Sequence, residues 1–202
     1  MPAKPKLGQN FLVDSEAIQR IAASIGDLTG RTVVEIGPGR GAITAALAAR
    51  AARVLAVELD PLLAAGLHVE FLLDASARVT VINEDALRFD FAAASAAAGE
   101  RLLVVGNLPY GITSQILLKL AASHAVLDRA VLMVQREVAD RVTAQPGSRH
   151  RPAGLAQLRT ALGHRAALRA GAEPLHAASR RLLAAARCVL DGLPLAICAA
   201  LR

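Results

Sequence analysis

Short apolar runs alternate with longer alanine- and leucine-rich segments along most of this chain. Each run is five or six residues long and is followed by a polar or glycine-containing turn, which is typical of buried strands. The runs cover residues 32–36, 53–58, 78–83, 101–106 and 130–135. Helical patterns with start signals lie around them, at residues 15–24, 42–50, 61–71, 113–122 and from 137 to 142. This alternation predicts an α/β fold with a mostly parallel sheet and right-handed crossovers.

The turn after the first run carries three glycines at alternate positions, in the order Gly37-Pro38-Gly39-Arg40-Gly41. Glycine tolerates positive φ and has no Cβ, so chain and ligand can approach closely. The next helix begins with N–H groups aimed at this turn, on the side of the sheet where doubly wound domains bind ligands. The spacing differs from the dinucleotide-binding G-x-G-x-x-G motif, and a tight turn without a ligand is the alternative.

Charge divides the chain near Pro146. The 202 residues carry a formal net charge of +6, but residues 146–202 hold 9 Arg against Glu173 and Asp191, so the positive excess lies entirely in the last quarter. That segment has no β-branched run, and its alanine, leucine and arginine content predicts a poorly ordered or irregular helical tail, with a helix around residues 179–189. We therefore divide the chain into a domain of residues 1–145 and an aberrant tail of residues 146–202.

Composition narrows the class of protein. No apolar run approaches the length of about 20 residues that a membrane helix needs, and the N-terminus lacks a signal-peptide core, so we expect a cytoplasmic protein without a membrane partner. The two cysteines, Cys188 and Cys198, form neither a metal-ligand pattern nor a disulfide framework, so we expect no metal site.

Acidic residues follow two of the predicted strands. Glu58 ends the second strand about 20 residues after the glycine turn, where a carboxylate can accept hydrogen bonds from ribose hydroxyls. A solvated charge at the end of a strand is the alternative. Asp85 follows the third strand and can accept from the exocyclic amine of an adenine, or it can cap a helix.

The fourth strand is followed by Asn107-Leu108-Pro109-Tyr110, which is the sharpest signal in the chain. A base amine could donate to the Asn107 side-chain oxygen and to the Leu108 carbonyl while its ring stacks on Tyr110, the only tyrosine. Stacking of this kind contributes about 1–3 kcal/mol per base, and enzymes that act on bases commonly extract them into such a pocket. The alternative is a type I turn with proline at its second position.

Five segments together resemble the ribosomal RNA adenine N6,N6-dimethyltransferases, the family of the KsgA enzyme and the Erm resistance methylases. They are Gly8-Gln9-Asn10-Phe11-Leu12, Glu35-x-Gly37-x-Gly39-x-Gly41, Val57-Glu58-Leu59-Asp60, Glu84-Asp85-Ala86-Leu87 and Asn107-Leu108-Pro109-Tyr110. Their order and spacing match the family over about residues 4–145, and the unmodified Gln-Asn-Phe-Leu favours the small-subunit branch over the resistance branch. The resemblance implies a Rossmann-like, S-adenosylmethionine-dependent methyltransferase that dimethylates N6 of adenosines in small-subunit rRNA.

The resemblance also implies roles for individual residues. Asn10 and Leu12 would contact S-adenosylmethionine from the N-terminal lead-in. The glycine turn would approach its methionine part through Gly37 and Gly39, Glu58 would bind its ribose, and Asp85 with Ala86 its adenine. Asn107 would face both the donor and the target amine. With Leu108 and Tyr110 it would hold the target adenine for two in-line methyl transfers, in which positioning provides the catalysis without a metal or a covalent nucleophile. We expect a monomer whose partner is the small-subunit rRNA or its precursor particle.

After Gln145-Pro146-Gly147-Ser148 the chain departs from the family pattern. The family's Gly-x-Leu-Ser-Val strand, its proline-rich loop and its C-terminal helical domain are missing or replaced. Read one base later, GC-rich codons for residues 175–182 permit Phe-Thr-Pro-Pro-Pro-Val-Asp-Ser, which motivates the hypothesis of a frameshift. The rival hypothesis is a genuine basic tail that binds RNA phosphates. Without the family's last strands, we expect the fifth strand or its neighbour to have an unpaired or poorly covered edge.

Three alternative functions stay open from the sequence. A methyltransferase of another substrate class would transfer the methyl group to a different acceptor. A non-enzymatic RNA-binding chain would bind RNA with steep salt dependence. A truncated or frameshifted product would be inactive or impaired.

Overall fold

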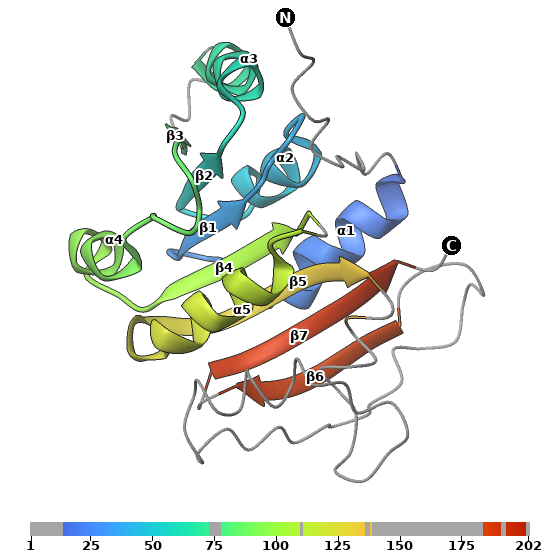
Figure 1. The fold of residues 1–202 in the computed structure, drawn as a ribbon. Helices are drawn as coiled ribbons and strands as arrows, with labels where there is room; N and C mark the ends of the chain where they lie inside the picture. Colours follow the sequence, from blue (N-terminus) through green and yellow to red (C-terminus); the bar gives the residue numbers. More distant parts are fainter. Residues whose placement is uncertain are drawn as a thin grey trace, which may run out of the picture.

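The computed structural model of this protein describes residues 14–72, 78–109, 111–135, 138, 184–190 and 193–200. Its helices and strands follow one another in the order predicted for an α/β domain (Figure 1). The helices are α1 (Ser15–Ser24), α2 (Ala42–Ala48), α3 (Pro61–Leu72), α4 (Phe91–Ala98) and α5 (Thr113–Ala122), with a short 3₁₀ turn η1 (His124–Val126). The strands are β1 (Thr32–Ile36), β2 (Arg53–Glu58), β3 (Val79–Asn83), β4 (Leu102–Asn107), β5 (Leu127–Gln135), β6 (Ala184–Leu190) and β7 (Leu193–Ala200).

The strands form one sheet in the order β3-β2-β1-β4-β5-β7-β6. All neighbours run parallel except β6 and β7, which confirms the predicted mostly parallel sheet. β1 lies between β2 and β4, with Ile36 beside Val57 of β2 and beside Gly106 of β4. The chain therefore leaves β1 for β2 on one side and returns to β4 on the other, and ligands of open α/β sheets bind at the carboxyl ends of the strands at such a reversal.

The C-terminal strands correct two predictions. Residues 184–190 form strand β6, so the helix expected around residues 179–189 is wrong over that part, and its first residues lie outside the described ones. Strand β7 pairs with β5 from Ala130–Leu195 to Gln135–Ala200, so the exposed edge expected at β5 is also wrong. Alanine and leucine have high helix propensity, but propensity is a weak prior that sheet pairing overrides. Here β6 pairs with the adjacent β7, and β7 pairs with β5.

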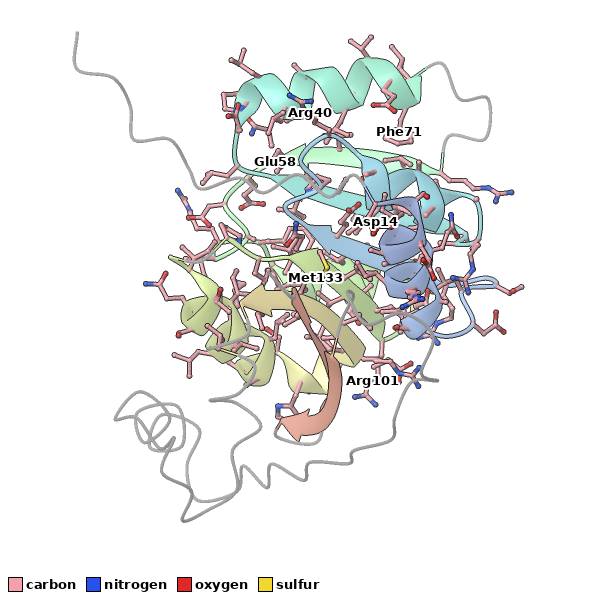
Figure 2. The ribbon with its side chains drawn as sticks, turned by 90° about the vertical axis from the view of Figure 1, so that its right-hand side faces the viewer. Asp14, Arg40, Glu58, Phe71, Arg101 and Met133 are labelled. Atoms are coloured by element: carbon pink, nitrogen blue, oxygen red, sulfur yellow. The ribbon has the colours of Figure 1, made fainter. Side chains whose placement is uncertain are left out.

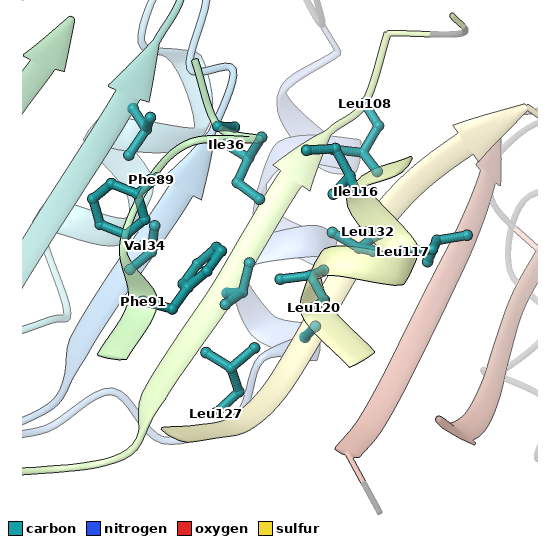
Figure 3. Close-up of a cluster of buried hydrophobic side chains, with 14 of the residues drawn as sticks. Val34, Ile36, Phe89, Phe91, Leu108, Ile116, Leu117, Leu120, Leu127 and Leu132 are labelled. Atoms are coloured by element: carbon teal, nitrogen blue, oxygen red, sulfur yellow. The ribbon is translucent and has the colours of Figure 1, made fainter. Parts of the chain in front are cut away.

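Helices cover both faces of the first five strands (Figure 1). The face toward α1 and α2 buries Val33, Val54, Leu103 and Val131 against Ile21 and its neighbours. The opposite face packs on α4 and α5 and includes Val34, Phe91, Leu117, Leu120 and Leu132 (Figure 3). Because side chains alternate along a strand, residues 33, 35 and 37 lie on the α2 side and residues 34 and 36 on the α5 side.

A side-chain cap begins α1. Asp14 Oδ1 accepts hydrogen bonds from the N–H groups of Glu16 (2.9 Å) and Ala17 (3.1 Å), which is N-capping of the expected kind. Helix α4 has no counterpart among the predicted elements. The helix predicted from residue 137 lies outside the described residues except for Val138, which is helical.

The amino ends of the central strands are tied together by charged groups. Arg31 Nε donates to Glu100 Oε2 (2.6 Å), and its Nη2 donates to Asp128 Oδ2 (3.1 Å) and to the Arg101 carbonyl (3.0 Å). The other oxygen of Glu100 accepts the N–H of Thr32 at 2.7 Å. These bonds join the amino ends of β1, β4 and β5.

Candidate functional site

The glycine turn connects β1 to α2 in a conformation that requires glycine. Gly37, Gly39 and Gly41 have φ of 67°, 61° and 79°, in the left-handed region that side chains disfavour. A Cβ built on Gly41 would lie 2.7 Å from Leu67 Cδ2 and 3.3 Å from Phe71 Cε2, so α3 packs directly against the turn. The turn is thus held from β1, α2 and α3.

Glu58 ties this turn to the one that follows β2 (Figure 2). Its Oε2 accepts the N–H of Gly39 at 3.0 Å, and its Oε1 accepts the N–H of Asp60 at 2.9 Å. The residue is only 6% exposed, which rules out the alternative of a solvated charge at the end of a strand. Each carboxylate oxygen has a second lone pair, so Glu58 keeps acceptor capacity for a ligand.

Glu35 is a second carboxyl group at the same edge, to which the sequence analysis gives no role. It is 1% exposed, and among the described side chains its Oε2 and the hydroxyl of Thr44 are the buried polar atoms without a hydrogen-bond partner. Burial raises the pKa of Glu35 to about 7; the Thr44 hydroxyl partly offsets this effect, and the charge of Glu58 adds to it. Its place before the glycines in the motif is the only signal of it in the sequence.

A cavity of about 560 Å³ opens beyond the carboxyl ends of β2 and β3. Its lining combines apolar and charged side chains, and consists of Leu59, Ile82, Asn83, Glu84, Asp85 and Arg88. The volume falls in the range of small-molecule sites. Leu59, Ile82 and Arg88 were given no role by the sequence analysis, although their positions at or just after strand ends are the same signal that singled out Asp85.

Asp85 and Ala86 differ in how they meet this cavity. Asp85 lines it while its Oδ1 accepts the N–H of Leu87 at 2.9 Å, so this carboxylate also closes a turn. It does not cap a helix, as its alternative interpretation held, because α4 begins at Phe91 and is capped by Asp90. The side chain of Ala86 is 7% exposed and belongs to the hydrophobic core cluster rather than to the cavity lining.

Asn107 and Leu108 end β4 beside the glycine turn. A Cβ built on Gly37 would lie 3.7 Å from the Asn107 carbonyl oxygen, which places these two strand ends side by side. Leu108 donates its N–H to the Met133 carbonyl at 3.0 Å and buries its side chain in the core. The Pro109 carbonyl accepts from the hydroxyl of Thr113 at 3.1 Å, which fixes the segment onto α5.

The structure therefore brings most of the predicted site residues to one edge of the sheet, in the spatial order Asp85, Glu58, Gly37 with Gly39, and Asn107 with Leu108. Asn10, Leu12 and Tyr110 lie outside the described residues. In the part of the chain that the structure describes, no cluster of three or more His, Cys, Asp or Glu could hold a metal ion. Within the same ranges, none of the helices is both long enough and apolar enough to span a bilayer.

Comparison with known proteins adds an independent finding. Residues 2–160 match the family model described as ribosomal RNA adenine dimethylase. The chain is 59% identical over 146 residues to ribosomal RNA small subunit methyltransferase A of Acidobacterium capsulatum, covering 72% of this chain and 50% of the relative. Its counterpart in Koribacter versatilis is 46% identical over 157 residues, covering 72% and 54%. The chain thus spans about half the length of the curated relatives that it matches.

Solved structures agree with the sequence matches. The 23S rRNA methyltransferase ErmE superposes with a TM-score of 0.59 at 34% identity, covering 66% of this chain and 51% of that one. A dimethyladenosine transferase from Plasmodium falciparum superposes with a TM-score of 0.57 at 25% identity, covering 66% and 46%.

Proposed function

Because this chain belongs to the ribosomal RNA adenine dimethylase family, we propose that it transfers methyl groups from S-adenosylmethionine to N6 of adenosines in small-subunit rRNA. One observation carries the proposal. Gly37, which the resemblance assigns to the donor, and Asn107, which it assigns to the target base, follow or end neighbouring strands at one edge of the sheet. A Cβ on Gly37 would lie in van der Waals contact with the Asn107 carbonyl oxygen. The similarity of the chain to small-subunit methyltransferases supports the choice of substrate.

The donor fits the residues on the β2–β3 side of this edge. The cavity beside Asp85 has room for an adenine ring, with Ile82 and Leu59 supplying apolar surface. Each oxygen of Glu58 accepts one backbone N–H and keeps a second lone pair for a ribose hydroxyl. Gly37 and Gly39, whose positive φ favours glycine, carry no Cβ atoms where the methionine part would lie. When bound, S-adenosylmethionine supplies an electrophilic methyl group on a cationic sulfur. Asn10 and Leu12 would complete this part of the site.

The target adenine belongs on the β4 side. Asn107 and the Leu108 carbonyl would accept the two amine hydrogens, which turns the nitrogen lone pair toward the donor. Tyr110 would stack on the base and keep it out of the RNA helix. Leu108 is anchored to β5 through Met133, so this part of the site is rigid before substrate arrives. Catalysis would then rest on orientation of two reactants in a fixed geometry.

We also propose that residues 1–145 form the donor-binding domain and that the segment of residues 146–202 impairs methylation in this chain. The family model ends at residue 160, and the relatives extend to about twice the matched length. A frameshift would explain why the chain departs from the family after this point. The rival hypothesis is a genuine tail whose basic composition binds RNA phosphates. The expected partner is the small-subunit rRNA or its precursor particle, met by a monomer in the cytoplasm.

Methyl transfer from a tritium-labelled donor to unmethylated small-subunit particles tests the proposal with the purified 202-residue chain. We expect slow labelling of adenine N6 in the small-subunit RNA. Asn107→Ala should abolish the labelling, because Asn107 would face both the donor and the target amine. Glu58→Gln should weaken donor binding by about 10- to 100-fold, the usual loss for a hydrogen bond to a charged group. Glu100→Gln, a carboxylate at the opposite end of the strands, is the matched control and should leave donor binding unchanged.

The alternatives give other results in the same assay. Donor binding without any RNA labelling would identify an inactive product of the family. Labelling of a different acceptor would identify another substrate class. RNA binding that weakens with salt, without any binding of the donor, would identify the chain as a non-enzymatic RNA-binding protein.

A further inference from the structure

Two carboxyl groups lie together beneath the glycine turn, and only one of them has its partners. Glu35 is the penultimate residue of β1 and Glu58 is the last residue of the neighbouring β2, and both lie on the sheet face that packs on α2. Both oxygens of Glu58 accept backbone N–H groups, whereas Oε2 of Glu35 has no partner among the described residues. A buried carboxylate in that state is costly, because desolvation penalises its charge.

The elements packed around Glu35 bring little compensating charge. Helix α2 has no titratable residue, and α1 faces the sheet with Ile21 and its apolar neighbours, while its Glu16 and Arg20 pair with each other on the surface. The neighbouring strand β4 carries none at this end. Among the charged groups at this end of the described sheet, Glu58 is the one that acts on the pKa of Glu35. The turn adds the exposed Arg40, and Asp60, Glu84, Asp85 and Arg88 follow the ends of β2 and β3.

We infer that Glu35 is a specificity-determining residue that distinguishes the methyl donor from the spent product by the charge on the cofactor sulfur. The inference rests on the proposed function. The donor carries a cationic sulfonium and the product a neutral thioether, and the two are otherwise closely alike. A cation at the glycine turn stabilises the carboxylate of Glu35, so its proton is lost to solvent when the donor binds. After methyl transfer the sulfur is neutral, and Glu35 takes up a proton again.

The electrostatics of the free protein support this inference. The raised pKa of about 7 leaves Glu35 divided between its acid and its carboxylate at neutral pH. A unit charge in a partly buried site can move the pKa of a neighbour by one unit or more. Donor binding should therefore release about half a proton near pH 7, and product binding much less. The preference for donor over product should rise with pH until Glu35 is fully ionised.

Calorimetric titration of the full chain tests this in two buffers that differ in ionisation enthalpy. The difference in heat counts the protons released by S-adenosylmethionine and by S-adenosylhomocysteine, and it requires no variant. We expect release with the donor at pH 7, little with the product, and none with either ligand at pH 9. In Glu35→Gln the release should disappear, and the donor-over-product preference should fall about 3- to 10-fold. Glu100→Gln is the matched control and should titrate like the parent chain.

The outcomes separate the two proposals. Equal proton release with donor and product, or release that persists in Glu35→Gln, would overturn the role of Glu35 while the proposed function stands. Binding of neither ligand would overturn both. An infrared band of a protonated carboxyl group that is present in the free chain, weakened by the donor and absent from Glu35→Gln would identify the group directly.

Discussion

The two ends of the central strands are built in opposite ways. At their amino ends, Arg31 and Glu100 satisfy one another and the surrounding backbone, and Asp128 adds a second anion to the same guanidinium. At their carboxyl ends, three glycines with positive φ leave space and a cavity opens beside Asp85. Oε2 of Glu35 is buried there without a hydrogen-bond partner among the residues that the structure describes. We call the amino end of the strands the closed end, because charged groups bond to each other and to the backbone there. We call the carboxyl end the open end, because it keeps space for a ligand.

This difference indicates that the amino ends of the strands contribute more to the stability of the fold than the carboxyl ends. Ion pairs and backbone bonds at the amino ends hold β1, β4 and β5 in register. A buried carboxyl group without a partner works against folding and persists only where the rest of the structure compensates. Residues whose packing or hydrogen bonding is incomplete in the free protein are those where we expect a bound ligand to supply the missing contacts.

The largest effect should come from the open end. Gly41→Ala forces a side chain into φ of 79° and a Cβ to within 2.7 Å of Leu67 Cδ2, so we expect a loss of about 2–4 kcal/mol in the free energy of unfolding. Urea denaturation measures it. Gly66→Ala, on the same side of the sheet in α3 with nothing within 4 Å, is the control and should gain about 0.5–1 kcal/mol. Equal stability of the two variants would contradict the strained turn.

Glu35→Gln at the open end should change the free energy of unfolding by an amount that depends on pH. The pKa of Glu35 rises from 4.5 to about 7 on folding, so the native chain binds a proton between those values that the unfolded chain has lost, and stability falls as pH rises through that window. The variant removes this loss. We expect it to be about 1–3 kcal/mol more stable than the parent at pH 8 and nearly equal at pH 5, in urea denaturation at both pH values.

An exposed carboxylate provides the control for that experiment. Glu70→Gln on the surface of α3 should change stability little at either pH. A gain for Glu35→Gln that is the same at pH 5 and pH 8 would mean that Glu35 is not the titrating group.

The smallest effect belongs to the closed end. Glu100→Gln keeps an oxygen for the Thr32 N–H but removes the charge opposite Arg31, in a pair whose side chains are 31% and 23% exposed. We expect a loss of about 1 kcal/mol in stability. Donor affinity of the folded chain should not change. A weakened donor affinity would show that the two ends are coupled through β1.

The sequence predicts the first five strands well because each is a β-branched or leucine run that ends in a turn signal. Helix α4 could have been predicted too, since Asp90 caps it with Oδ1 and Gly99 ends it with φ of 69°. The strand over residues 184–190 could not, because its Ala-Ala-Ala-Arg start has helical propensity and only its pairing partners make it a strand.

The site shows the same division between local and distant causes. Glu58, Asp85 and Asn107 were predicted because each stands at the end of a strand, a property that is local in sequence. The pKa of Glu35 is raised by its burial in the packed fold and by the charge of Glu58 from another strand, and it is lowered by Thr44 from a helix, so no local pattern contains it. The cavity lining is likewise set by how β2 and β3 lie together.

The pairing of β7 with β5 has a consequence for synthesis of the protein. Ala130 pairs with Leu195, 65 positions further along the chain, whereas β6 and β7 join through neighbours such as Leu190 and Leu193. Chain closure over such a distance carries a larger entropy cost than hairpin formation, so the hairpin should form first and dock last. On the ribosome, β1 to β5 emerge well before β7, so the edge that holds Glu58 and Asn107 can assemble while the final strands are still being translated.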